Sequence, residues 1–371
     1  MGRLFCYFPV YKKPRQIYIR IEVLRLLTHE VNIGENMIDF DKLSCFIDLH
    51  LHLDGSLSLK NIRELSEVSG IPCPESDAEL KKLVSVDENC KSLNDYLEKF
   101  DFPLSFLQDR ETITLAVKNL LKEIHEDGVM YAEVRFAPQL HLRHGLTQKE
   151  VVEAALTGLK ESGVPGGLIL CLMRGNGNES QNGETILAAK EFLKEGVAAV
   201  DLAGAEALFP TQNYTDEFAL AKGLGIPVTI HAGEADGFES VLEALSFGAA
   251  RIGHGYHAMD DEDTMTLLRE KNVTLEMCPK SNLDTHTCSS LSDYPVKLFM
   301  DKGIPVTINT DDMTVSDTTL KEEFKRISSA LSLDEGDIKK IFIASAKAAF
   351  TDDAVKRSLI KRIEDEFNGG L

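Results

Sequence analysis

The 371-residue chain lacks several features that define whole classes of protein. No apolar run approaches the ~18 residues that a helix needs to span a bilayer. The cysteines are odd in number and contain no Cys-x-x-Cys pair, which argues against both a disulfide framework and a thiolate zinc site. A reducing cytoplasm therefore fits them best. They are Cys6, Cys45, Cys73, Cys90, Cys171, Cys278 and Cys288.

Positive charge is also scarce. The chain has 40 lysines and arginines against 60 aspartates and glutamates, which gives a formal net charge of −20. Nucleic-acid-binding proteins need a basic face for the phosphate backbone, so this balance argues against a nucleic-acid partner. It gives no support to binding an anionic membrane either. We expect a soluble protein whose partner is a small molecule, and the sequence leaves open whether it is a monomer or a homo-oligomer.

The N-terminal segment is basic and partly apolar, but it has neither a clean hydrophobic region nor a small-residue cleavage site. We therefore do not predict a signal peptide. Met37 begins a segment, "MIDFDKLSCFIDLHLHLDGS", that reads as a natural start. Residues 1–36 are expected to be an N-terminal extension of uncertain status, and residues 37–371 a single domain.

Short apolar runs of strand type alternate with longer amphipathic stretches along the rest of the chain. Alternation of strand and helix repeated eight times is typical of a (β/α)8 barrel, an α/β fold that often exceeds ~250 residues as one domain. Glycines in a helix-stop context precede several runs. The predicted strands are 45–53, 129–138, 167–174, 197–204, 226–234, 251–256, 273–279 and 304–312.

The first crossover, from about 56 to 128, is unusually long and contains several helical segments. Long insertions after a barrel strand lie at the catalytic face. Residues 92–109 within it are therefore a candidate lid over the pocket. An additional packing subdomain with no gating role explains the insertion equally well.

Ionisable residues end four of the predicted strands. His50 and His52 share a face of the first strand, and taken alone they fit a pair of core histidines as well as two metal ligands. His231, His254 and Asp311 end three later strands. Because the carboxyl ends of all the strands converge on one mouth of the barrel, these groups should meet, and this convergence favours a metal site.

Three imidazoles and one carboxylate suit zinc, with cobalt or iron possible on the same argument. A catalytic zinc lowers the pKa of bound water toward ~7 and makes the site hydrolytic. Glu234, three residues past His231, can serve as general acid or base, and His254 would lie beside the water. Two-metal hydrolytic sites on this kind of barrel commonly bridge their ions with a carboxylated lysine at the end of strand four. None occurs between Glu195 and Ala221, so we expect one metal ion per chain.

The motifs "HLHLDGS", "DLAGAE", "TIHAGEADG", "RIGHGYH", "EMCPKSN" and "NTDD" occur in this order from about residue 45 onward. Their order and spacing resemble those of the adenosine deaminase family, within the amidohydrolase superfamily, up to about residue 350. The resemblance implies a zinc-dependent aminohydrolase of purine metabolism and salvage. It would convert adenosine and 2′-deoxyadenosine to inosine and 2′-deoxyinosine, with water attacking purine C6.

The resemblance also implies a role for each site residue. His50, His52, His231 and Asp311 would bind zinc. Glu234 would protonate N1 of the purine, and His254 would orient the attacking water, with Asp311 also part of the catalytic group. Substrate contacts are expected from Asp312 at N7, from the backbone of Gly204 at N3, from Asp54 near the ribose 5′-hydroxyl, and from His52.

Three rival interpretations stay open. An adenine deaminase would use the same metal site on the free base, and an AMP deaminase would need a basic phosphate cluster that is not evident near the motifs. A non-catalytic deaminase-like binding protein would be expected to have degenerate ligands, whereas here every position is intact. Arg135 and Arg174 are expected to pair with carboxylates near the strand ends.

Overall fold

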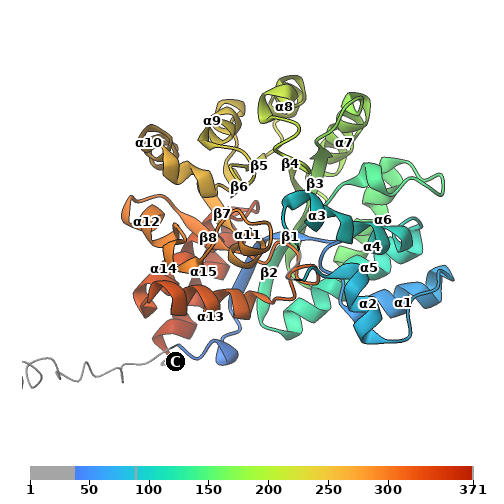
Figure 1. Ribbon diagram of the computed structural model, residues 1–371, viewed down its shortest axis with the longest axis horizontal. Helices are drawn as coiled ribbons and strands as arrows, with labels where there is room; N and C mark the ends of the chain where they lie inside the picture. The colour runs from blue at the N-terminus through green and yellow to red at the C-terminus, as the bar shows by residue number, and fades with distance from the viewer. Residues whose placement is uncertain (1–37, 88–89, 370–371) are drawn as a thin grey trace, which may run out of the picture. The chain divides into compact units, whose positions relative to one another are not determined.

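Eight parallel strands form the centre of the structure, and helices surround them (Figure 1). The computed structural model describes residues 38–87 and 90–369, so the predicted extension, residues 1–36, lies outside the described residues. Each strand overlaps a predicted one, and the (β/α)8 fold is confirmed. The strands are β1 Phe46–His52, β2 Val129–Phe136, β3 Gly166–Met173, β4 Val197–Ala203, β5 Thr229–Ala232, β6 Arg251–His254, β7 Thr274–Met277 and β8 Val306–Ile308.

Strands β1–β4 form one parallel sheet in sequence order, and strands β5–β8 form another. Two parallel bridges join the sheets, Val200 with Val228 and Leu51 with Asp311. At the second bridge the amide of His52 donates to the carbonyl of Asp311 over 2.8 Å. The eight strands therefore close into a barrel, and the closing contact lies among the predicted metal ligands.

A glycine at the end of a helix lies shortly before each of four strands, as the sequence predicts. Each has a positive φ, between 70° and 126°, a backbone conformation that residues other than glycine rarely adopt. At Gly128 a Cβ atom would also lie 2.8 Å from the carbonyl oxygen of Leu43, so the chain could not pass there with a side chain. The four are Gly128, Gly196, Gly225 and Gly303.

Strands β5 and β8 are shorter than predicted. Pro227 and Pro305 lie at their predicted starts, and proline has no N–H to donate to a ladder. At the other end, β8 ends at Ile308, and Asp311, which pairs with β1, takes a left-handed conformation with φ 61°. This conformation turns its side chain into the mouth while its backbone closes the barrel.

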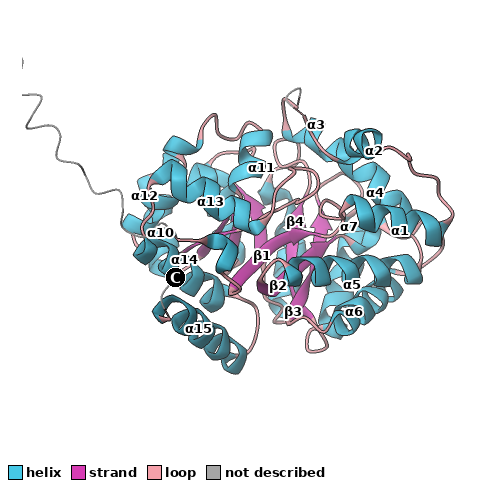
Figure 2. Cartoon of the chain, turned by 90° about the horizontal axis from the view of Figure 1, so that it is seen from below, coloured by secondary structure: helices cyan, strands magenta, loops and turns pink. Residues whose placement is uncertain are grey.

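The long first crossover consists of helices α1–α5. Figure 2 shows α3 and α11 at one end of the barrel and α15 at the other. Tyr96 of α3 is buried against Val315, and its hydroxyl lies 2.8 Å from Ser316 Oγ, just after the predicted site residues Asp311 and Asp312. The crossover thus covers the mouth, and its movement as a lid stays a prediction.

Helices pack around the barrel, and several of them begin at a side chain that caps the first turn, such as Ser58 before α1 and Asp352 before α15. In α6, Thr147 and Glu150 form a reciprocal capping box. No helix in the described part of the chain has the length and apolar character needed to cross a membrane. The helices are α1 Leu59–Ser69, α2 Asp77–Val84, α3 Leu93–Leu97, α4 Asp101–Phe106, α5 Arg110–Glu126, α6 Gln148–Ser162, α7 Glu179–Phe192, α8 Thr215–Gly223, α9 Phe238–Phe247, α10 Glu262–Lys271, α11 Pro279–Asp284, α12 Val296–Asp301, α13 Leu320–Leu331, α14 Glu335–Ala348 and α15 Asp353–Asn368.

Candidate active site

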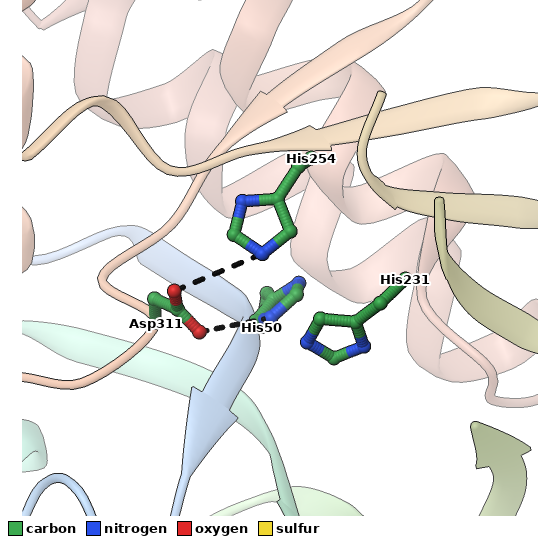
Figure 3. Close-up of side chains that lie close together, drawn as sticks. All are labelled: His50, His231, His254 and Asp311. Atoms are coloured by element: carbon green, nitrogen blue, oxygen red, sulfur yellow. Dashed lines mark ion pairs between the residues drawn. The ribbon is translucent and has the colours of Figure 1, made fainter. Parts of the chain in front are cut away.

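The carboxyl ends of the strands bring the predicted ionisable side chains to one mouth. His50 and His52 lie on β1, His231 on β5 and His254 at the end of β6, and Asp311 follows β8. Figure 3 shows three of these imidazoles and the carboxylate pointing toward one another. One donor atom from each of the four residues drawn there lies within 4.8 Å of the others.

The fourth imidazole, His52, lies in the same cluster. Its Nε2 is 3.2 Å from Nε2 of His231 and 3.3 Å from Oδ1 of Asp311. His50 Nε2 is 3.0 Å from that same oxygen. Four donor atoms, three nitrogens and one carboxylate oxygen, therefore converge from β1, β5 and the segment after β8.

The protonation of these imidazoles fits a metal ion. The Nδ1 atoms of His50 and His231 each face a carboxylate oxygen at 2.9 Å, from Glu276 and Asp201 respectively. Nδ1 of His50 is hydrogen-bonded to Glu276 and therefore holds the ring proton, so its Nε2 presents a lone pair to the cluster. Nδ1 of His231 lies beside Asp201 but forms no hydrogen bond within the described residues. His50 Nε2 is buried and has no hydrogen bond in the part of the chain described. A lone pair facing a carboxylate oxygen at 3.0 Å is repulsive without a cation between them, so this donor set suits zinc.

His254 is the least closely placed member of the group drawn in Figure 3. Its Nε2 lies 3.8 Å from Oδ2 of Asp311 and 3.5 Å from Oε2 of Glu234. Burial lowers the pKa of His254 to about 3, so the ring is neutral. The shorter contacts of His52 favour the predicted ligand set of His50, His52, His231 and Asp311, which stays a prediction.

Arg135 links the two carboxylates that hold the imidazoles. Its Nη1 lies 2.9 Å from Asp201 and its Nη2 lies 2.8 Å from Glu276, all of them buried. Although burial opposes ionisation, Arg135 and Arg251 hold the pKa of Glu276 well below its ordinary value. The anchors of both imidazoles are thus charged at neutral pH, which strengthens the histidines as ligands.

Two site residues have left-handed backbone, His254 with φ 59° and Asp311 with φ 61°. Such a conformation costs of order 1–3 kcal/mol at a residue other than glycine, and it clusters at functional sites. Here it turns each side chain off the end of its strand and toward the cluster.

Glu234 lies just beyond β5, buried between His254 and Thr285, whose hydroxyl donates to Oε1 over 3.5 Å. Burial, together with the negative charges of Asp311 and Glu206, raises the pKa of Glu234 well above its ordinary value. This shift favours the neutral form of the carboxyl group, which can donate a proton.

The loop that carries Glu234 is held by another carboxylate, Glu206. Its two oxygens accept the backbone N–H groups of four consecutive residues, 233–236, over 2.8–3.2 Å. Ser240 Oγ also donates to Glu206 over 2.5 Å. This fixes the backbone on which the acid stands, and so its direction into the pocket.

His254 has a defined tautomer. Tyr294 donates its hydroxyl hydrogen to Oδ1 of Asn282 over 2.7 Å, which leaves the amide nitrogen of Asn282 facing Nδ1 of His254 at 3.1 Å. An amide nitrogen only donates, so Nδ1 accepts. The single ring proton of His254 therefore lies on Nε2, which faces the mouth.

A cavity of about 380 Å³ opens beside the cluster. All of the predicted substrate residues line it, together with Glu234 and His254. Helix α3 and the residues after it add an apolar wall that includes Leu97 and Phe100. The predicted substrate residues are His52, Asp54, Gly204 and Asp312.

Asp312 presents a buried, unsatisfied acceptor to this cavity. Its Oδ1 has no hydrogen bond within the described residues, and a Cβ atom on Gly55 would lie 1.8 Å from it. Gly55 therefore leaves the space that the side chain occupies. Burial raises the pKa of Asp312 well above its ordinary value, and that of Asp54 to about 6. Both groups are poised to bind a polar ligand.

Sequence reasoning missed the residues that hold the site from behind. Asp201 and Glu206 belong to the quoted "DLAGAE" motif, and Glu276 opens "EMCP", but none was assigned a task. Arg135 pairs with carboxylates as predicted. For Arg174 the prediction is wrong, since it donates to the carbonyls of Phe209 and His231 and to Thr211, and forms no ion pair in the described chain.

Comparison with known proteins places this geometry in a family. The family model described as adenosine deaminase matches residues 46–366. A curated adenosine deaminase from Haemophilus ducreyi is 46% identical over 330 residues, covering 86% of this chain and 96% of that protein. Another from Enterococcus faecalis is 41% identical over 325 residues, with the same coverage of each chain.

Solved structures agree on the fold. An adenine deaminase from Arthrobacter aurescens is 26% identical, with a TM-score of 0.78, covering 87% of this chain and 98% of that one. An amidohydrolase from Burkhoderia ambifaria with bound zinc has a TM-score of 0.81 at 19% identity, covering 91% of this chain and 95% of that one. The second likeness shows the barrel alone.

Proposed function

Because the chain belongs to the adenosine deaminase family, we propose that it hydrolyses adenosine and 2′-deoxyadenosine to inosine and 2′-deoxyinosine with release of ammonia. The observation that carries this proposal is the placement of Glu234. Its carboxyl group, whose neutral form burial favours, lies 3.5 Å from His254 and lines the same cavity as the imidazole cluster. Hydrolysis at an aromatic amidine carbon needs both an activated water and a proton for the ring nitrogen.

In this proposal His50, His52, His231 and Asp311 hold one zinc ion per chain. A bound zinc supplies a water that is a strong nucleophile at neutral pH. Glu276 accepts the hydrogen bond from Nδ1 of His50 and so keeps Nε2 of that ring free for the metal, and Asp201 lies 2.9 Å from Nδ1 of His231. Cobalt or iron would suit the same donors.

The remaining residues bind the base and move protons. Glu234 donates the proton of its carboxyl group to N1 of the purine, which makes C6 electrophilic. The N–H at Nε2 of His254 faces Oδ2 of Asp311 and orients the water for attack on C6. The carboxyl group of Asp312, whose protonated form burial favours, donates a hydrogen bond to N7 of the base, the backbone of Gly204 meets N3, and Asp54 with His52 meets the ribose.

An adenine deaminase is the alternative that the same cluster permits. A substrate panel tests the choice between the two activities. Protein of measured zinc content is given adenosine, 2′-deoxyadenosine, adenine or AMP, and turnover of each is measured by ultraviolet absorbance. We expect turnover of both nucleosides and little of adenine or AMP. Faster turnover of adenine would overturn the assignment to nucleosides, and no turnover of any of the four by zinc-loaded protein would overturn the deaminase itself.

We expect residues 37–371 to act as one catalytic domain in the cytoplasm. The six cysteines within the described residues are all free thiols, in keeping with a reducing compartment. The expected partner is a small purine nucleoside.

A further inference from the structure

A second cavity lies at the opposite end of the barrel from the metal cluster. It has a volume of about 700 Å³ and is lined by the first residues of two strands, Arg251 of β6 and Thr274 of β7, and by Pro305 just before β8. These are the amino ends of strands whose carboxyl ends carry or adjoin the cluster. Helix α14 and Lys356 of α15 also line the cavity, and Figure 1 shows both helices beside β7 and β8.

One face of α14 forms most of this wall. The lining positions recur every three or four residues and so share one side of the helix. They are 336, 339, 340, 343, 344, 347 and 348. Ile343 and Ala344 form an apolar floor, to which Phe350 adds a ring. Lysines stand around that floor, so the cavity combines an apolar base with cationic walls.

The lysines are short of carboxylate partners. Lys339 Nζ bonds the amide oxygen of Asn368 over 3.2 Å, and Lys356 Nζ bonds the carbonyl of Lys347 over 2.9 Å. Lys347 has no ion pair within the described residues. Of the four lining lysines, only Lys340 meets a carboxylate, Asp337, at 3.2 Å.

No aspartate or glutamate lines the cavity. Arg251, which also lines it, is already neutralised by Glu133 at 2.6 Å and by Glu276. The cavity therefore carries about three uncompensated positive charges in a chain whose net charge is −20. Such a local excess attracts a multiply charged anion.

We propose that this cavity binds a phosphorylated small organic anion of nucleotide size. Lysine ammonium groups act as point charges for phosphate. The floor of Ile343, Ala344 and Phe350 suits the flat or apolar part of such a molecule, and the volume lies within the usual range of small-molecule sites, ~300–1,000 Å³. Three lysines around one cavity do not form the extended basic face that a nucleic acid requires.

Titration calorimetry on the full-length, zinc-loaded protein tests this proposal, because the readout does not depend on deamination. The probe is uridine 5′-diphosphate, whose pyrimidine base has no purine C6 amino group. Inorganic phosphate and uridine are titrated separately to separate the phosphate contribution from that of the base. Zinc content is measured before and after, to exclude chelation as the source of heat.

We expect one molecule of uridine 5′-diphosphate per chain, bound more tightly than phosphate and more weakly at high salt. The double substitution Lys339→Glu with Lys347→Glu should weaken binding at least tenfold, and the milder pair Lys339→Gln with Lys347→Gln less. The control pair Lys194→Glu with Lys222→Glu, at exposed positions after α7 and in α8, makes the same change of net charge outside the cavity and should leave affinity within twofold. All variants should keep wild-type turnover of adenosine.

Three results would overturn the proposal. One is no binding of uridine 5′-diphosphate at millimolar concentration to the folded wild-type protein. Another is binding that both double variants of Lys339 and Lys347 retain. The third is equal weakening by the control pair Lys194→Glu with Lys222→Glu, which would show only the loss of overall positive charge.

Discussion

His50 donates from Nδ1 to Oε2 of Glu276 across 2.9 Å, although 226 residues separate them in the chain. Glu276 faces the barrel interior from the middle of β7 and is also bound by Arg135 and Arg251. The hydrogen bond decides which nitrogen of His50 can bind a metal. Glu276 is therefore a positioning residue for the cluster although it contacts no substrate.

Replacing Glu276 by Gln should weaken zinc retention by about 10–100-fold, as is typical when the partner of a ligand histidine is altered. The measurement is zinc loss to a competing chelator. Thr229→Val is the matched control, since Thr229 Oγ1 bonds the other oxygen of Glu276 over 2.9 Å and contacts no ligand. Equal zinc loss from the two variants would contradict the role of the His50 contact.

Glu234→Gln should leave zinc bound and lower kcat by about 10²–10⁴-fold, because the amide has no acidic proton for N1. Zinc content and the affinity for a purine nucleoside product serve as controls, and both should be close to wild type. Turnover at the wild-type rate would rule out Glu234 as the acid.

Asn282→Ala should remove the donor that fixes the tautomer of His254. We expect kcat to fall about tenfold with a smaller change in KM, since a wrongly protonated ring misplaces the water rather than the nucleoside. Tyr294→Phe keeps the amide but frees its orientation, so its effect should be weaker and in the same direction. A larger loss in Tyr294→Phe than in Asn282→Ala would contradict this order of action.

Removing zinc with a chelator should abolish activity and lower the free energy of unfolding. An ion that binds only the folded chain, present at a thousand times its Kd, stabilises it by about 4 kcal/mol. Denaturant unfolding with and without added zinc measures the difference. His52→Ala should lose most of the zinc-dependent part, whereas His257→Ala, on the half-buried His257 that pairs with Asp260, should keep it.

Glu323 should make stability depend on pH. It is buried, and desolvation raises its pKa to about 7 from an ordinary value of 4.5, despite hydrogen bonds from Thr318 and Arg326. Below pH 4.5 the group is protonated in both states and costs nothing. As pH rises from 4.5 to 7, the unfolded chain ionises first, so stability falls by about 3 kcal/mol.

The comparison that isolates this group is Glu323→Gln against wild type, by denaturant unfolding at pH 5 and pH 8. The variant should lose less stability than wild type over that interval. Parallel pH curves for the two proteins would show that Glu323 does not titrate between them.

Local patterns in the sequence were enough to predict the eight strands and the residues at their ends. Strand periodicity and helix-stop glycines are local signals, and the barrel fold then brings the strand ends together. The supports behind the ligands depend on contacts between distant segments, and no local pattern predicts that Glu276 faces His50 or that Glu206 binds the loop of Glu234. The partners of Arg174 were predicted wrongly because an arginine at a strand end can donate to backbone carbonyls as readily as to carboxylates. The lysines of α14 recur with the period of a helix, and an ordinary solvent-exposed helix face has the same spacing, so the sequence alone does not predict the cavity that they line.

The bridge between Leu51 and Asp311 has a consequence for the order in which the protein matures. His50 and His52 leave the ribosome early, and Asp311 leaves it about 260 residues later. A nascent chain that has already exposed both histidines has only part of the predicted donor set. We therefore expect metal loading to follow the closure of the barrel, because the predicted ligands of β1 and of the segment after β8 meet only when this bridge forms.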